Sequence, residues 1–351
     1  MRLFDHVADL PVTVESVSRD RFESDTSSGF LRKTTVFSLA GDGAVGRGED
    51  VTYDAEDHDA LADAPADAVD LIGSYDSFAD FSAALDGVDL FPTKDPERET
   101  AEHYRRWALE SAGLDLALRQ ADTDLAAAVD RERDPVRFVA STRLGDPPSA
   151  DRVEALLDRD PDCEFKLDPT TDWHGELVAS LAAHDCVRIL DLKGQYEGTE
   201  VDQAPDPDLY ERVLSGFPDA VVEDPAFTDE TRPLFDGHEG RVSWDAPITG
   251  VESVERLPFE PSWLNVKPSR FGTVESLFDT IEYADERGMS LYGGGQFELD
   301  VGRDHIQLLA SVFYPDGPND VAPGEYNLPD LPAELPTSPL VPSADSSGLD
   351  F

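Results

Sequence analysis

Lysine is the rarest charged residue in this chain, and two lysines lie where they could take part in chemistry. The sequence has five lysines against twenty-three arginines and seventy-five aspartates and glutamates. Lys166 and Lys267 flank Asp191, Glu223 and Asp245 along the chain, and each of these five residues ends a short apolar run. The steps between them are 25, 32, 22 and 22 residues, a spacing typical of consecutive strand–helix units. The spacing predicts that two amines and three carboxylates meet at one mouth of a barrel.

The chemistry open to such a set is metal-assisted proton transfer. Carboxylates that share one mouth repel one another unless a cation neutralises them, and Mg²⁺ prefers oxygen ligands. We therefore expect Asp191, Glu223 and Asp245 to bind Mg²⁺. Lys166 and Lys267 would remove and return a proton next to a substrate carboxylate, while the metal stabilises the enediolate. Burial and the dication would lower the lysine pKa toward about 7–8.

Each of these groups also has an ordinary alternative. A lysine can be a surface residue or part of a structural ion pair, and a carboxylate can belong to an acidic surface. The rarity of lysine, and the apolar pairs that precede Asp191 and Glu223, favour the site over these alternatives.

Two patterns of secondary structure divide the chain. Residues 1–125 combine a β-rich run at 34–39, a Gly41-Asp42-Gly43 turn and a long helical pattern at 97–121, which predicts an α+β capping domain. In residues 126–325, strands alternate with helices. Strands are predicted at 136–141, 163–167, 187–191, 220–223, 242–245, 263–267, 290–292 and 320–322, with helices at 150–157, 173–183, 207–214, 228–235, 251–256, 274–286 and 301–312. The predicted fold class is α/β, a modified TIM barrel (β/α)7β with the cap at its N-terminus. We expect the Pro-rich tail, 326–351, to pack on the cap.

The composition limits the partners. A formal net charge of −47 with so little lysine is typical of a protein adapted to molar salt, and no basic patch is present to bind nucleic acid. No apolar run reaches the roughly 20 residues that span a bilayer, and the N-terminus lacks the pattern of a secretion signal. Cys163 and Cys186 form neither a disulfide framework nor a zinc motif. We expect a cytoplasmic protein that acts on a small-molecule carboxylate and forms a homo-oligomer, without a nucleic-acid or membrane partner.

Several motifs resemble a known family when they are taken together and in order. They are GDGAVGRGE (41–49), ALESAGLDLALRQA (108–121), FKLD (165–168), ILDLKG (189–194), VVEDP (221–225), SWDAP (243–247), LNVKPSRFG (264–272) and YGGGQFELDVGRDHIQLLAS (292–311). The set resembles the muconate-lactonising branch of the enolase superfamily, in a haloarchaeal type of composition. That branch includes o-succinylbenzoate synthases, N-acylamino-acid racemases and dipeptide epimerases. The resemblance implies a capped barrel, Mg²⁺ at Asp191, Glu223 and Asp245, and catalysis by Lys166 and Lys267.

The chain departs from the family pattern at several positions. Glu164 replaces the first lysine of a Lys-x-Lys strand, Lys193 replaces an asparagine, Ala246 replaces an acid, and Gly272-Thr273 replaces a glycine pair. Glu164 and Lys193 would lie near the mouth on neighbouring strands, so a compensating ion pair between them is a further hypothesis.

Four residues are candidates for substrate binding. They are Lys193, Arg270, Gly294 and Glu298, and each has a structural alternative: an ion pair for the charged groups and a tight turn for the glycine. The predicted reaction is elimination, as in o-succinylbenzoate synthesis, or racemisation, epimerisation or cycloisomerisation. The alternative is a catalytically degenerate barrel with a binding or structural role, which the departures motivate.

Overall fold

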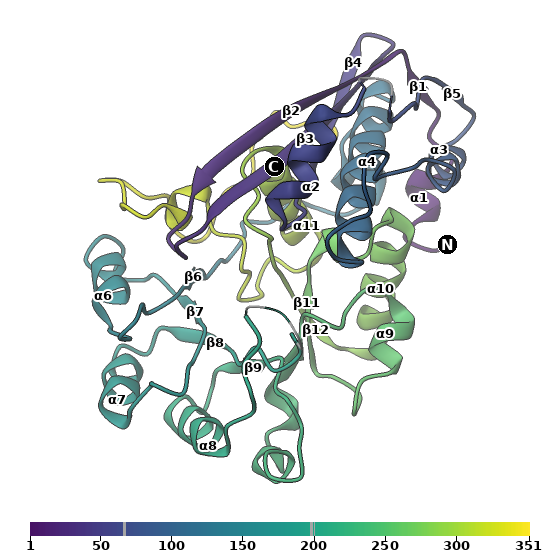
Figure 1. Cartoon of the computed structure of the whole chain (residues 1–351). Helices are drawn as coiled ribbons and strands as arrows, with labels where there is room; N and C mark the ends of the chain where they lie inside the picture. The colour runs from purple at the N-terminus through teal and green to yellow at the C-terminus, as the bar shows by residue number, and fades with distance from the viewer. Residues whose placement is uncertain (66–67, 197–198, 200) are drawn as a thin grey trace.

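The computed structural model describes residues 1–65, 68–196, 199 and 201–351. An N-terminal domain of antiparallel strands and helices lies against one end of a parallel barrel (Figure 1). The predicted fold class is therefore confirmed. Among the described residues, no helix combines the length and the apolarity that crossing a membrane requires.

The N-terminal domain is built around one long helix and a three-stranded sheet. Its strands are β1 Val12–Val14, β2 Ser16–Asp25, β3 Leu31–Gly41, β4 Ala44–Asp50 and β5 Gly73–Tyr75, and its helices are α1 Asp5–Ala8, α2 Ala55–Asp63, α3 Phe78–Leu85, α4 Thr100–Gln120 and α5 Leu125–Ala128. Strands β2, β3 and β4 form an antiparallel sheet. Asp42 and Gly43, both with positive φ, make the two-residue turn between β3 and β4. A side chain at Gly48 would lie 1.9 Å from the Ala108 carbonyl oxygen, so glycine allows α4 to pack directly on β4.

The second domain is a ring of parallel strands. They are β6 Ala140–Thr142, β7 Phe165–Leu167, β8 Val187–Asp191, β9 Val221–Glu223, β10 Val242–Trp244, β11 Trp263–Val266 and β12 Ser290–Gly293, hydrogen-bonded in chain order. Asn319 pairs with Phe138 just before β6, and Asp320 pairs with Gly294 just after β12, both in parallel. This eighth segment joins the two edges of the sheet, as the sequence predicted.

Helices cover the outside of the ring, and a small apolar cluster fills its interior. The helices are α6 Asp151–Leu157, α7 Gly175–Ala183, α8 Pro207–Gly216, α9 Val251–Glu255, α10 Val274–Arg287 and α11 Val301–Phe313. Val139, Ile189, Val221 and Tyr292 form the interior cluster. The period-2 alternation of each strand sends these residues inward and their neighbours toward the helices.

One predicted helix is wrong. Residues 228–235 form only a 3₁₀ helix, Arg232–Phe235. The Thr231 hydroxyl donates to the Ala226 carbonyl at 2.7 Å and accepts from the Thr228 amide, so side-chain hydrogen bonds replace the first helical turn.

The C-terminal segment contacts both domains. Leu349 is buried, and its amide donates to Asp115 of α4 at 2.8 Å, while Arg119 lies 2.5 Å from Asp350. Leu340 pairs with Val136 beside the barrel. The segment thereby links α4 to the start of the ring.

Candidate active site

Three carboxylates lie together at the C-terminal end of the barrel strands. Asp191 and Glu223 are the last residues of β8 and β9, and Asp245 follows β10 directly. All three side chains are fully buried, and one oxygen of each lies within 4.8 Å of the others. We call these residues the carboxylate triad. Oδ1 of Asp245 accepts no hydrogen bond from the described residues. A buried donor set made only of carboxylate oxygens fits a hard divalent cation such as Mg²⁺.

The two predicted catalytic lysines contact the triad from different strands. Lys166 lies in β7 and Lys267 follows β11, so their strands flank the three that carry the carboxylates. Lys166 Nζ donates to Glu223 Oε1 and lies 3.5 Å from Asp191 Oδ2. Lys267 Nζ donates to Asp245 Oδ2 at 2.8 Å. The structure therefore brings all five predicted residues together.

The carboxylate triad raises the pKa values of both lysines above their ordinary value. Burial alone would lower the pKa of Lys166, but the negative charges of Glu223 and Asp191 hold it well above its ordinary value. Burial also opposes the charged form of Lys267, and Asp245 raises its pKa overall. Neutral lysine would therefore require a cation that compensates the carboxylates.

The pKa values within the triad diverge. Burial raises the pKa of Glu223 to about 8, because Asp191 and Asp245 add to the burial penalty that Lys166 opposes. Burial would also raise the pKa of Asp191 and Asp245. Lys193 and Lys166 lower the pKa of Asp191, and Arg270 and Lys267 lower that of Asp245. One carboxyl group of the triad is thus much harder to ionise than the other two.

Glu223 is held by residues that the sequence analysis did not single out. Asn265 Nδ2 donates to Glu223 Oε2 at 3.0 Å, and the Tyr292 hydroxyl donates to the same oxygen. Ser243 Oγ lies 2.9 Å from that hydroxyl. Asn265 stands two residues before Lys267, so strand periodicity places both on the inner face, and this signal could have identified it.

Asp224 is a second residue that the sequence analysis missed. It is fully buried, has a left-handed φ of 49°, and accepts hydrogen bonds from the amides of Asp245 and Ala246, both at 2.9 Å. Burial, followed by the charges of Asp245 and Asp191, raises its pKa to about 7. Asp224 fixes the backbone that carries Asp245, and the paired acids of VVEDP were the available signal.

Lys193 and Arg270, two of the substrate-binding candidates, contact the triad instead of standing apart from it. Lys193 Nζ donates to Asp191 Oδ2 and lies 3.7 Å from Asp168 Oδ1. Arg270 Nε lies 3.1 Å from Asp245 Oδ1. The Tyr196 hydroxyl donates to Asp245 Oδ2 at 2.7 Å, and the Tyr196 ring faces Lys193 Nζ and the Arg270 guanidinium at 5.2 and 5.9 Å. Tyr196 therefore contacts Asp245 with its hydroxyl and both Lys193 and Arg270 with its ring.

Gly294 and Glu298, the other two candidates, lie on the loop after β12. A side chain at Gly294 would come within 2.4 Å of Asn265 Oδ1 and 2.7 Å of Lys267 Cε, so glycine leaves the space that Lys267 occupies. Glu298 is buried, accepts from the Gln296 amide at 2.8 Å and lies 3.7 Å from Arg303. These partners agree with the structural alternative for Glu298, whereas its Oε2 accepts no hydrogen bond from the described residues, so substrate binding by Glu298 stays a prediction.

The hypothesis of an ion pair between Glu164 and Lys193 is wrong. Glu164 precedes β7 by one residue and accepts from Arg137 Nε and Arg188 Nε, both at 2.6 Å. These residues lie where their strands begin, at the opposite end of the barrel from Lys193. The departure at Glu164 therefore does not alter the triad.

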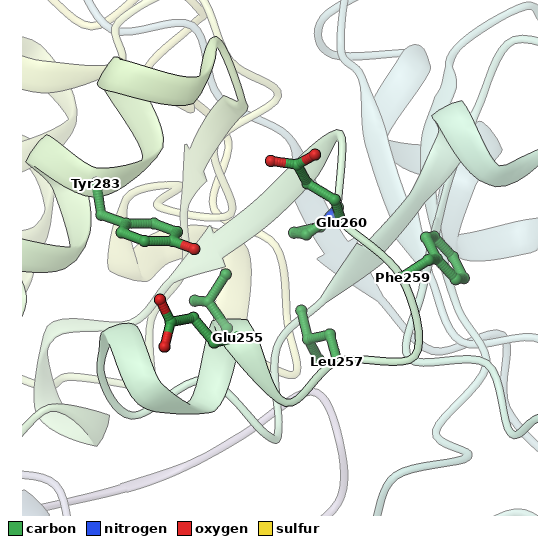
Figure 2. Close-up of a pocket in the computed structure, with 7 residues that line it drawn as sticks. Glu255, Leu257, Phe259, Glu260 and Tyr283 are labelled. Carbon is green, nitrogen blue, oxygen red and sulfur yellow. The ribbon is translucent and has the colours of Figure 1, made fainter.

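A cavity of about 230 Å³ lies away from the triad, between α9 and α10 (Figure 2). Leu257, Phe259 and Tyr283 supply its apolar lining, and the carboxylates of Glu255 and Glu260 lie beside it. Residues 255–261 lead into the start of β11, so the cavity belongs to the N-terminal end of the barrel. It has no part in the site described here.

The ring of parallel strands and the cap form a capped (β/α)7β barrel, a fold that solved members of the enolase superfamily share. Two family models match the sequence: Domain of unknown function (DUF8230) N-terminal domain over residues 5–128, and the DUF8230 C-terminal domain over residues 132–328. The chain belongs to the DUF8230 family. A comparison with curated proteins finds no match.

Solved structures share this fold at low sequence identity. A dipeptide epimerase from Methylococcus capsulatus, complexed with Mg and the dipeptide L-Arg-D-Lys, superposes with a TM-score of 0.71 at 15% identity, over 96% of this chain and 99% of that chain. A muconate cycloisomerase from Pseudomonas fluorescens gives 0.66 at 18% identity, over 93% and 92%. A member of the enolase superfamily from Listeria innocua gives 0.63 at 17%, over 89% and 86%.

Proposed function

We propose that this protein catalyses Mg²⁺-dependent removal of the proton α to a carboxylate of a small molecule. The outcome would be elimination, or racemisation, epimerisation or cycloisomerisation. The observation that carries the proposal is the contact of two buried lysines, Lys166 and Lys267, with three buried carboxylates at the mouth of the barrel. The similarity in fold to a muconate cycloisomerase and a Mg-bound dipeptide epimerase supports the proposal.

Asp191, Glu223 and Asp245 would hold the metal. When bound, Mg²⁺ would stabilise the negative charge that develops on the substrate carboxylate. Lys166 Nζ and Lys267 Nζ would carry the proton as base and acid. In racemisation the two amines would act on opposite faces of the α-carbon, and in elimination one would move the proton while the other stabilises charge. Asn265 and Tyr292 would orient Glu223, and Asp224 would fix Asp245.

Proton exchange from solvent deuterium tests this proposal. The protein would be incubated with Mg²⁺ in deuterated buffer with N-acyl amino acids, dipeptides and a succinylbenzoate precursor, and NMR would follow the α-proton. We expect exchange with at least one class, lost in EDTA and restored by Mg²⁺.

If no proton exchange is seen, a Mg²⁺ titration by calorimetry in high salt distinguishes a protein that binds no metal from one that binds metal without catalysis. Absence of magnesium-dependent heat would reject the metal site and the enzymatic proposal together. Metal binding without exchange on any α-proton carboxylate would instead favour a degenerate barrel with a binding role.

A further inference from the structure

The backbone at Lys193 is constrained in a conformation that is unusual for lysine. Its φ of 54° lies in the left-handed region, which a residue with a Cβ adopts at an energetic cost. Hydrogen bonds on both sides hold it there, from the Leu192 amide to the Glu223 carbonyl and from the Gly194 amide to the Asp224 carbonyl, both at 2.9 Å. A side chain at Gly194 would lie 2.4 Å from the Ala226 amide nitrogen, so the loop cannot easily shift. The constraint points to a role for the side chain it positions.

The Lys193 ammonium group lies between two carboxylates, one inside the triad and one outside it. Nζ donates to Asp191 Oδ2 and lies 3.7 Å from Asp168 Oδ1. Asp191 is fully buried, whereas the side chains of Lys193 and Asp168 are 14% and 15% exposed. Asp168 also lies 3.5 Å from Arg143 Nε, so it is a carboxylate shared between cations at the mouth.

Lys193 and a divalent cation would compete for the same oxygen. An ammonium group on Asp191 Oδ2 repels a dication at the triad, and in a buried site this repulsion is weakly screened. Lysine has a flexible stem, and Asp168 offers the ammonium group a second acceptor without a change in the backbone. Lys166 and Lys267 also contact the triad, and Lys166 Nζ lies 3.5 Å from the same Asp191 Oδ2, but these two lysines are the proposed proton carriers.

We propose that Lys193 is an internal competitor of the metal and that Asp168 is the carboxylate that accepts Lys193 when a divalent cation binds. This inference rests on the metal site of the proposed function and adds a residue pair that controls its occupancy. Lys193 neutralises Asp191 in the metal-free protein and weakens Mg²⁺ binding. Asp168 reduces that penalty, because it stabilises the ammonium group in its displaced position.

A double-mutant cycle on Mg²⁺ affinity tests this proposal. Calorimetry would measure the Mg²⁺ Kd of the full chain in about 1 M KCl, where long-range charge effects are screened. The variants are Lys193→Met, Asp168→Asn and the double variant. Lys33→Met is the matched control, because Lys33 is also 14% exposed and pairs with Asp59 at 3.0 Å in the cap. Lys193→Asn is a second variant that removes the charge with a residue that tolerates the left-handed backbone.

We expect Lys193→Met and Lys193→Asn to bind Mg²⁺ roughly tenfold more tightly than the wild type, and Lys33→Met to leave the affinity unchanged. Asp168→Asn should weaken binding roughly threefold in the wild type and by less than twofold in the Lys193→Met background. Ordinary electrostatics predicts that the two effects multiply independently, so this non-additivity is specific to the proposal.

Two results would overturn the proposal while leaving the proposed function intact. One is an unchanged Mg²⁺ affinity in both Lys193 variants. The other is an equal effect of Asp168→Asn in both backgrounds. Absence of Mg²⁺ binding in the wild type and in every variant would instead reject the metal site itself, and the inference with it.

Discussion

The two ends of the barrel both contain charged side chains, but these charges are arranged differently. At the N-terminal end, Glu164 accepts hydrogen bonds from Arg137 and Arg188, and all three side chains retain contact with solvent, at 17%, 40% and 29% exposure. At the C-terminal end, the carboxylate triad is fully buried. Lys166 and Lys193, which neutralise part of its charge, also contact carboxylates outside the triad.

The difference in burial and charge balance agrees with a structural role for the Glu164 cluster and with the proposed function of the triad. Burial alone would raise the pKa of Glu164, but hydrogen bonds from Arg137 and Arg188 lower it, so the ionised carboxylate is favoured. At the triad, burial raises the pKa of Glu223 to about 8. Neighbouring cations lower the pKa values of Asp191 and Asp245. An incompletely balanced buried cluster costs stability unless a ligand completes it. Perturbed groups of this kind are typical of functional sites.

The largest expected effect is loss of proton exchange when a site lysine is removed. Lys166→Met and Lys267→Met should each lower the exchange rate by about 10²–10⁴-fold, because each removes an acid–base group from the triad. Deuterium incorporation measured by NMR checks this, with Lys33→Met as a control that removes a lysine from the cap. Full exchange in both site variants would contradict the assignment.

Magnesium should stabilise the protein through the C-terminal end alone. At a Mg²⁺ concentration a hundredfold above Kd, the unfolding free energy should rise by about 2.7 kcal/mol, because the metal binds only the folded chain. Denaturant unfolding with Mg²⁺ and with EDTA measures the increment. Glu164→Gln should keep it and Asp245→Asn should lose it. Retention in Asp245→Asn would place the metal elsewhere.

The barrel could be predicted from the sequence because several of its strands are short apolar runs that end in a charged residue. Val187–Asp191 has the predicted bounds, because a short apolar run that ends in an acid marks a buried parallel strand. Lys166, Asp191, Glu223, Asp245 and Lys267 meet at one end because parallel strands bring their carboxyl ends together.

The side-chain contacts between residues far apart in the chain could not be predicted from the sequence. Tyr196 reaches Asp245 from a loop 49 residues earlier in the chain, and no local pattern predicts that contact. Glu164 was assigned to the wrong end, because strand spacing identifies neighbouring strands but a two-residue shift moves a side chain by about 7 Å along the barrel. The partners of charged groups therefore required the structure.

Replacing Gly294 should damage the C-terminal end more than an equivalent change elsewhere. Gly294→Ala would place a methyl group 2.4 Å from Asn265 Oδ1 and 2.7 Å from Lys267 Cε. We expect a loss of about 1–3 kcal/mol in unfolding free energy from overpacking, and a fall in exchange rate as Lys267 is displaced. Gly240→Ala is the control, because no atom lies within 4 Å of its added methyl group. Equal behaviour of the two variants would argue against close packing around Lys267.

The smallest effect should come from the N-terminal end and should leave proton exchange unchanged. Glu164→Gln removes the negative charge that two arginines share, so the unfolding free energy near pH 7 should fall by about 1–2 kcal/mol. Glu252→Gln, in an exposed pair with Arg256, is the control and should change stability by less than about 0.5 kcal/mol.

The pH dependence of the loss in unfolding free energy distinguishes the contribution of the Glu164 charge from that of its packing. The pKa of Glu164 is lower in the folded protein, so its stabilisation is present above the unfolded pKa of about 4.3 and disappears as the pH falls through the folded value. The difference in unfolding free energy between the wild type and Glu164→Gln should therefore narrow as the pH falls below about 4. Denaturant unfolding at pH 7, 5, 4 and 3 measures it. A difference that stays constant over this range would mean that packing of Glu164, and not its charge, stabilises the N-terminal end.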